Sequence, residues 1–209
     1  CWVCDKGLFP PIILHDAPIL RVGVKVESVN DFLFAHKLAL QDRIVGEPLA
    51  RFRHVAVFHA PGAELSVVER HGWVGFAPDA SDTSTRLKAR GHFEALRTRQ
   101  RFASSDAEGF AITNHVVDAA INDLGKDWTC DLFFAAERDY WMSRNRAAKV
   151  QKARQDKLGL GWANHDHHTY RCGRGNFKDL IRLWEKLGFH ARERFYAGAE
   201  AGWGAQVME

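Results

Sequence analysis

Apolar and polar residues alternate along short stretches of the N-terminal third, which is the pattern of half-buried β-strands. These stretches predict strands at residues 19–26, 43–45, 53–59 and 65–69. After the first of them, Ser28 and Asn30 are typical helix-start residues, and the apolar positions that follow predict a helix reaching about residue 41. Residues 19–71 are therefore expected to form a β-α-β-β-β module, preceded by a loop segment at residues 1–18.

The C-terminal residues 165–209 repeat this order of elements. A strand is expected at residues 167–172, followed by a helix whose apolar positions from Phe177 to Leu187 have helical spacing and which Gly188 ends. Two further strands are expected at residues 190–196 and 203–209. The fourth strand of this second module is either the last of these or lies beyond the chain.

Residues 72–164 separate the two modules and are too many for a connecting loop. The spacing of apolar residues predicts helices at residues 93–102, 112–124 and 128–158, the last as one long or broken helix. This insertion is therefore expected to be mostly helical. The whole pattern predicts an α+β fold in which two βαβββ-type modules flank the helical insertion.

Composition and charge narrow the class of protein. The 209 residues are 46% hydrophobic, which is enough for a core, and no stretch approaches the roughly 18 apolar residues of a membrane span. The formal net charge of +3 argues against a dedicated nucleic-acid surface. The four cysteines are too few and too scattered for a disulfide scaffold. We therefore expect reduced thiols and a cytoplasmic protein with no membrane partner.

The N-terminus has two features of its own. Cys1 and Cys4 have the spacing of half a zinc site, to which His15 could add a ligand, but no second Cys-x-x-Cys pair follows. The chain also starts with cysteine rather than methionine. We interpret this start as a trimmed or partial chain; a lipoprotein and an enzyme that uses its amino-terminal thiol are the alternatives.

The densest group of chemistry-bearing side chains is Asn164-His165-Asp166-His167-His168. Neutral imidazole is the commonest protein metal ligand, and Asp166 could orient a ligating ring. Because neighbouring strand residues face opposite sides, at most two of the three histidines can serve one site. The segment predicts a metal site at the start of the second module; a surface strand end with chance histidines is the alternative.

The run from Asp166 to Cys172, together with the Leu187-Gly188-Phe189 turn, resembles the modules of the vicinal oxygen chelate superfamily of glyoxalases, bleomycin-resistance proteins and extradiol dioxygenases. The resemblance covers residues 19–70 and 165–209. It implies that the two modules form a curved mixed sheet and that modules can pair between chains, as in a homodimer.

By this resemblance the protein is a metal-dependent dioxygenase, lyase or isomerase that acts on a small oxygenated organic substrate. A divalent metal ion would polarise vicinal oxygens of that substrate. His167 would be one ligand, and Glu69 or Glu209, each at the end of an expected strand, would supply the carboxylate. Two histidines with one carboxylate suit ferrous iron, whereas a site richer in carboxylates suits Mn, Zn or Ni.

Three further residues are candidates for the same chemistry. Arg21 stands where the first module's histidine ligand is expected, and its guanidinium could bind a substrate carboxylate through two hydrogen bonds. His59 and Tyr170 are the candidate catalytic acid/base groups. An ordinary structural or solvent-facing role is the alternative for all three. The tryptophans expected in the core or in pocket walls are Trp128, Trp141 and Trp162.

Two other classes of function stay open. A non-catalytic small-molecule-binding protein of the same fold typically lacks the metal histidines, so His167 favours the enzyme. A nucleic-acid-binding protein would use the basic run at residues 144–157, and an HNH-like nuclease would use Asp166 and His167 with Asn176 and His190. Acidic residues dilute the basic run, and a solvated helix face is the usual meaning of such a run.

Overall fold

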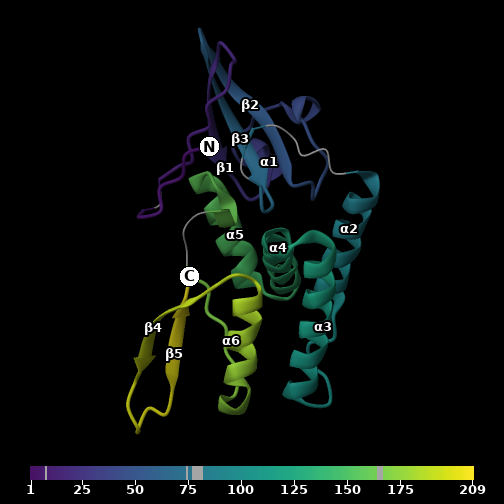
Figure 1. Cartoon of the computed structure of the whole chain (residues 1–209), viewed down its shortest axis with the longest axis vertical. Coiled ribbons are helices and arrows are strands. Elements are labelled where there is room, and N and C mark those ends of the chain that lie inside the picture. Colours follow the sequence, from purple (N-terminus) through teal and green to yellow (C-terminus); the bar gives the residue numbers. More distant parts are fainter. Residues whose placement is uncertain (8, 74, 77–81, 164–166) are drawn as a thin grey trace.

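The chain folds as an α+β protein with a three-stranded sheet at one end, a region of packed helices in the middle and a two-stranded hairpin beside the helices (Figure 1). The computed structural model describes residues 1–7, 9–73, 75–76, 82–163 and 167–209. Within these residues, no helix is both long and apolar enough to cross a membrane.

The three-stranded sheet is mixed. Its strands are β1 (Leu20–Lys25), β2 (Phe52–Ala60) and β3 (Ala63–Arg70), in the order β1-β3-β2. Strand β3 is parallel to β1 and antiparallel to β2, to which a tight turn joins it. Helix α1 (Val29–Ala35) covers the sheet, and its buried residues Val29 and Leu33 pack with Val26, Val55 and Val67.

Five longer helices form the middle of the molecule. They are α2 (Thr83–Thr98), α3 (Asp106–Leu124), α4 (Lys126–Arg144), α5 (Arg146–Leu158) and α6 (Phe177–Lys186). Helix α4 is central: it contacts α2, α3 and α5, and its buried Trp128, Leu132 and Phe133 belong to the larger hydrophobic core. Short 3-10 turns lie at Gln41–Arg43, Gly161–Ala163 and Arg174–Asn176.

The helical insertion is confirmed, with different boundaries. The break in the expected long helix lies at Asn145, whose side-chain oxygen accepts hydrogen bonds from the backbone N–H groups of Ala147 and Ala148 and so caps α5. Helix α2 begins ten residues before the expected start at residue 93, because Asp82 caps it. The helix expected to reach residue 41 ends at Ala35, where Lys37 has a positive φ of 56°.

The prediction of a strand at residues 43–45 is wrong. Residues 41–43 form a 3-10 turn, and Val45 makes a single bridge with His54. Gly46 has a φ of 100°, which turns the backbone out of the extended conformation directly after that bridge. The first module therefore consists of β1, α1, β2 and β3.

The prediction of a strand at residues 167–172 is also wrong, since none of these residues belongs to a strand. The Tyr170 ring packs against Trp184 with centroids 4.7 Å apart, and it also contacts Phe134. The segment is held on the helices by these aromatic contacts, so it has no neighbouring strand to pair with.

The C-terminal strands are confirmed, but they form a separate sheet. Strands β4 (Ala191–Tyr196) and β5 (Gly204–Met208) pair only with each other among the described residues. The expected pair of βαβββ modules in one curved sheet is therefore not seen in the described part of the chain. The physical reason is that the apolar faces of the helices bury one another between the two sheets (Figure 1).

Candidate functional site

Two of the predicted site residues, Arg21 and His59, lie on either side of Glu64 in the sheet. Both are cross-strand partners of Glu64. The Arg21 Nε atom lies 3.0 Å from Glu64 Oε1, and His59 Nδ1 lies 3.9 Å from Glu64 Oε2. A hydrogen bond from Ser66 and the charge of Arg21 lower the pKa of Glu64. The guanidinium proposed for a substrate carboxylate thus already faces a carboxylate of the protein.

Glu69, a predicted metal ligand, is buried at the end of β3. Its Oε1 atom accepts hydrogen bonds from the backbone N–H of Val29 at 2.6 Å and from Arg53 Nη1 at 3.1 Å. Burial raises the pKa of Glu69, while Val29 and Arg53 oppose that shift. The carboxylate holds the start of α1 against the sheet.

The other two predicted metal ligands lie on the surface. Glu209 Oε2 is 3.1 Å from Arg192 Nη1, and its backbone pairs with His190. His167 is exposed. No three histidine, cysteine, aspartate or glutamate side chains in the described residues lie close enough together to hold a metal ion. Asn164, His165 and Asp166 lie outside the described residues, and the metal site stays a prediction.

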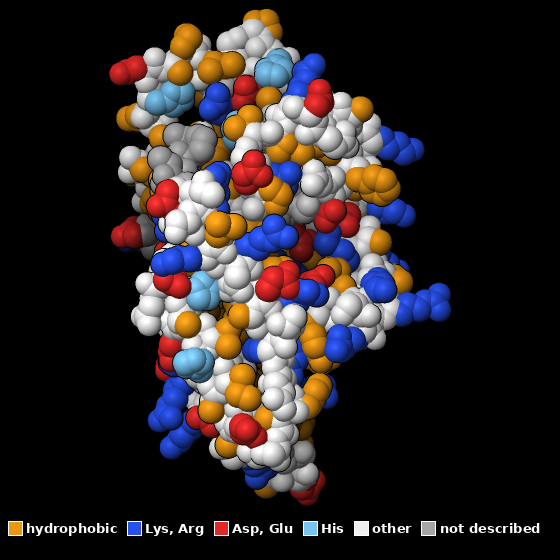
Figure 2. Space-filling view, turned by 90° about the vertical axis from the view of Figure 1, so that its right-hand side faces the viewer, with side chains coloured by type: hydrophobic (Ala, Val, Ile, Leu, Met, Phe, Trp, Pro, Cys, Tyr) orange, Lys and Arg blue, Asp and Glu red, His pale blue; other side chains and the backbone are white. Residues whose placement is uncertain are grey.

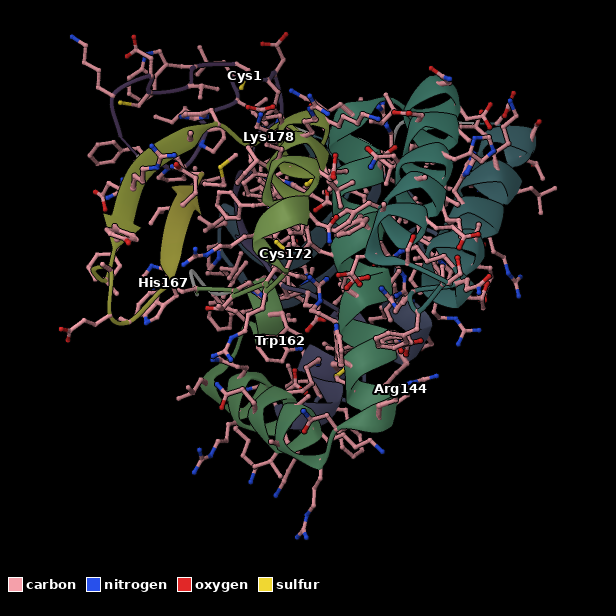
Figure 3. All side chains as sticks on the ribbon, turned by 90° about the horizontal axis from the view of Figure 1, so that it is seen from below. Cys1, Arg144, Trp162, His167, Cys172 and Lys178 are labelled. Atoms are coloured by element: carbon pink, nitrogen blue, oxygen red, sulfur yellow. The ribbon has the colours of Figure 1, made fainter. Side chains whose placement is uncertain are left out.

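Tyr170, the remaining candidate, lines a cavity of about 130 Å³ between α4, α5 and the segment at residues 167–172. We call it the aromatic cavity. Its walls include Arg138, Trp141, Met142, Trp162, His168 and Tyr170. Figure 3 shows Trp162 between α5 and the segment that carries His167 and Cys172. The structure thus brings Tyr170 together with one histidine of the motif.

Several hydrogen-bond donors around the aromatic cavity have no partner among the residues that the structure describes. The Nε atom of Arg138 donates to Glu27 Oε1 at 2.9 Å, but its two Nη atoms make no hydrogen bond or ion pair with a described residue. Trp162 Nε1 is buried and has no partner among these residues. The Tyr170 hydroxyl likewise has none there, and burial raises its pKa, which keeps it a donor.

The acidic residue of this wall is already paired. The Glu137 carboxylate lies 2.6 Å from Arg99 Nη2 and 2.5 Å from Arg101 Nη1, and all three side chains are nearly buried. The cavity therefore offers spare donors, while its own carboxylate is bound to protein cations. Such a surface is complementary to a ligand with acceptor oxygens.

Arg138 and Trp162 carry this site, and the sequence did not single out Arg138. Trp162 and Trp141 are pocket walls, whereas Trp128 is part of the core. Arg138 stands three residues before Trp141 on α4, so the two share one face of the helix. The spacing of Arg138 and Trp141, which places an arginine and a tryptophan on one helical face, was the feature of the sequence that could have indicated this site.

The basic run at residues 144–157 is partly used inside the protein. Lys152 is buried, and its ammonium lies 2.9 Å from Asp31, 3.3 Å from Glu27 and 2.5 Å from Asp156. Figure 2 shows a different face, on the side of α2 and α3, where Lys and Arg side chains are interspersed with acidic and hydrophobic ones.

Comparison of the chain with protein-family models, with curated proteins and with solved structures found no match. Any function is therefore inferred from the side chains themselves. The aromatic cavity, with its spare donors, is the feature of the described residues that most resembles a binding site.

Proposed function

We propose that this protein binds a small oxygenated organic molecule in the aromatic cavity. One observation carries the proposal: Arg138, whose two Nη atoms have no partner among the described residues, lines the same cavity as the rings of Trp141 and Trp162. Ligand pockets are mostly apolar and hold a few well-placed polar groups, and this cavity has both parts.

The volume limits the ligand. A cavity of about 130 Å³ is close to the engineered cavity of about 150 Å³ that binds benzene, whereas drug-sized ligands need about 300 Å³ or more. A carbonyl or carboxylate oxygen would accept hydrogen bonds from Arg138 and from the Tyr170 hydroxyl. A single ring or a short chain that carries oxygen at one end fits this cavity.

This proposal keeps the small-molecule partner expected from the sequence and corresponds to the binding-protein alternative. It does not include the metal-dependent reaction. No group of three described metal-ligating side chains lies together, so no step is assigned to a metal ion here. That reaction stays a prediction of the family resemblance.

A cavity-filling variant tests the proposal. Ala148 lines the cavity from α5, and Ala147 is its exposed neighbour on the same helix. Phenol, benzyl alcohol and benzoate are titrated into the full chain by calorimetry or ligand-observed NMR. We expect at least one to bind, Ala148→Leu to weaken binding at least about tenfold, and Ala147→Leu to leave it unchanged.

Either of two results would overturn the proposal. The first is that none of the three compounds binds the unaltered chain. The second is that Ala148→Leu and Ala147→Leu bind them with the same affinity, because the ligand would then lie elsewhere.

A further inference from the structure

A second, polar cavity adjoins the aromatic one. It has a volume of about 90 Å³ and shares Arg138 and Trp162 with the aromatic cavity. Its other polar walls come from the ends of β1 and β3 and from α4: Lys25, Glu27, Arg70, His71 and Asp131. This volume is too small for a ring and leaves room for a group of a few atoms.

Cations outnumber carboxylates in this wall. Lys25, Arg70 and Arg138 face two acidic residues, Glu27 and Asp131. Among the described residues, neither Lys25 nor Arg70 makes an ion pair with a carboxylate. Arg70 instead donates to the backbone oxygen of Gly75 and lies over aromatic rings. The polar cavity therefore has positive charge, on Lys25 and Arg70, that no described carboxylate pairs with.

The two carboxylates are already held by protein groups. Glu27 lies 2.9 Å from Arg138 Nε and 3.3 Å from Lys152 Nζ, and its Oε2 atom accepts the backbone N–H of Trp162 at 3.0 Å. Asp131 Oδ2 accepts the backbone N–H of Gly72 at 2.7 Å. These contacts fix the acidic groups in place, so their oxygens do not satisfy the cations Lys25 and Arg70.

Buried polar atoms without partners line the same cavity. The Nδ1 atom of His71, the Nε atom of Arg70 and the Nε1 atom of Trp162 are all buried and have no hydrogen-bond partner among the described residues. Buried polar groups nearly always have a partner, whether in the protein, in water or in a ligand. A ligand with several acceptor oxygens would supply partners for the N–H groups of Arg70 and Trp162, and for His71 in the tautomer that carries its proton on Nδ1.

We propose that the polar cavity is an oxyanion subsite, which binds a carboxylate or phosphate group between Arg138, Lys25 and Arg70. Arginine binds both groups through two parallel hydrogen bonds, and Arg138 has both Nη atoms to offer. Since Arg138 and Trp162 line both cavities, the ligand is a small organic acid with its acid group here and its apolar body in the aromatic cavity. The single ligand that spans both cavities rests on the proposed function, whereas the oxyanion subsite itself does not.

The first experiment uses inorganic anions, so that it does not depend on the aromatic cavity. Phosphate and acetate are titrated separately into the full chain at constant ionic strength, and the indole N–H signal of Trp162 is followed by NMR. A Trp162→Phe variant assigns that signal. We expect a saturable shift with at least one of the two anions, and the pair of titrations tells phosphate from carboxylate. The absence of a saturable shift with both would overturn the subsite.

Matched charge variants locate the site. Lys25 is exposed and forms no ion pair with a described residue, so the Lys25→Met variant should fold normally. Its affinity for the anion should be about three- to fivefold lower. Arg138→Lys keeps the positive charge beside Glu27 but removes the two Nη donors of the guanidinium. The affinity for the anion should fall about tenfold. Lys149→Met, on the exposed face of α5, is the control. Equal effects of Lys25→Met and Lys149→Met would overturn the proposal.

A last comparison separates this inference from the proposed function. Benzoate should bind more tightly than acetate, and Ala148→Leu should remove that difference without changing the affinity for acetate. Equal affinity for benzoate and acetate overturns the single ligand that spans both cavities. Binding of benzyl alcohol without binding of either anion would leave the proposed function standing and overturn the oxyanion subsite.

Discussion

The carboxylate of Glu69, in strand β3, accepts a hydrogen bond from the backbone N–H of Val29, the first residue of helix α1, at 2.6 Å. The same oxygen lies 3.1 Å from Arg53 Nη1, and both side chains are nearly buried. A negative charge at the start of a helix is favourable because the first N–H groups there lack helical partners. Glu69 therefore joins two elements of the fold by one oxygen atom.

Glu69→Ala should destabilise the protein strongly. The substitution leaves the buried Arg53 charge and the Val29 N–H without their partner, and removal of one member of a buried ion pair costs about 3–5 kcal/mol. Glu69→Gln keeps an acceptor oxygen and should cost about 1–3 kcal/mol. Urea unfolding followed by circular dichroism measures both. A free energy of unfolding for Glu69→Ala equal to that of the unaltered chain would contradict the anchoring role.

The predicted metal site can be tested apart from the fold. The family resemblance predicts Fe, Mn, Ni or Zn in protein purified without chelator, and its loss in His167→Ala. Because the Glu69 oxygen is engaged by Val29 and Arg53, we expect Glu69→Gln to keep the metal content of the unaltered chain. Elemental analysis of the three proteins measures this. If freshly purified protein holds no metal and takes up none of these ions, the metal-dependent reaction is ruled out.

Gly72 should tolerate substitution much less than Gly62. Both have a positive φ, +64° and +73°. A Cβ at Gly72 would lie 2.6 Å from the backbone N of Trp128, whereas nothing lies within 4 Å of one at Gly62. Gly62→Ala should cost about 1 kcal/mol for the left-handed backbone. Gly72→Ala should cost a further ~1–3 kcal/mol because α4 must shift.

Thermal and urea unfolding of the two glycine variants check this difference. Gly62→Ala serves as the control for backbone strain alone. The prediction fails if both variants lose the same stability, since the close approach between Gly72 and α4 would then contribute nothing.

Cys130 should be nearly inert toward alkylating reagents. Burial, with smaller effects from Asp131 and Asp127, raises the pKa of its thiol to about 12. Thiolate is the reactive form, and at pH 8 only about one thiol in ten thousand would be ionised at any moment, so the reaction is slow. We expect iodoacetamide to label the exposed Cys1 in the folded protein and Cys130 only after denaturation. Peptide mass spectrometry measures both sites, and equal labelling rates in the folded state would contradict the burial of Cys130.

Local patterns of apolar and polar residues predicted several elements, including β1, whose partner strand β3 lies far along the chain. The helix at residues 177–187 and the strands around residues 20–25 and 53–59 were correctly predicted from periodicity alone. Residues 167–172 show why the same reasoning failed elsewhere. A strand needs a partner to pair with, and no local pattern shows that Tyr170 packs on Trp184 instead.

The candidate site was predictable in part. Tyr170 and the tryptophans Trp141 and Trp162 stood out in the sequence, and all three line the aromatic cavity. Arg138 was missed because its role depends on Glu27, a residue 111 positions away. Charged side chains on a helix are usually solvated, and only the fold reveals which of them faces a cavity.

The sequence by itself determined the α+β class and the helical insertion, because helix hydrogen bonds join residues four apart and leave a local pattern of apolar positions. Only the tertiary structure decided how the strands divide into two sheets, that Glu69 anchors a helix, and that Arg138 and Trp162 lie between two cavities. Those outcomes depend on contacts between residues far apart in the chain, such as Glu27 with Arg138, and on which apolar faces bury each other.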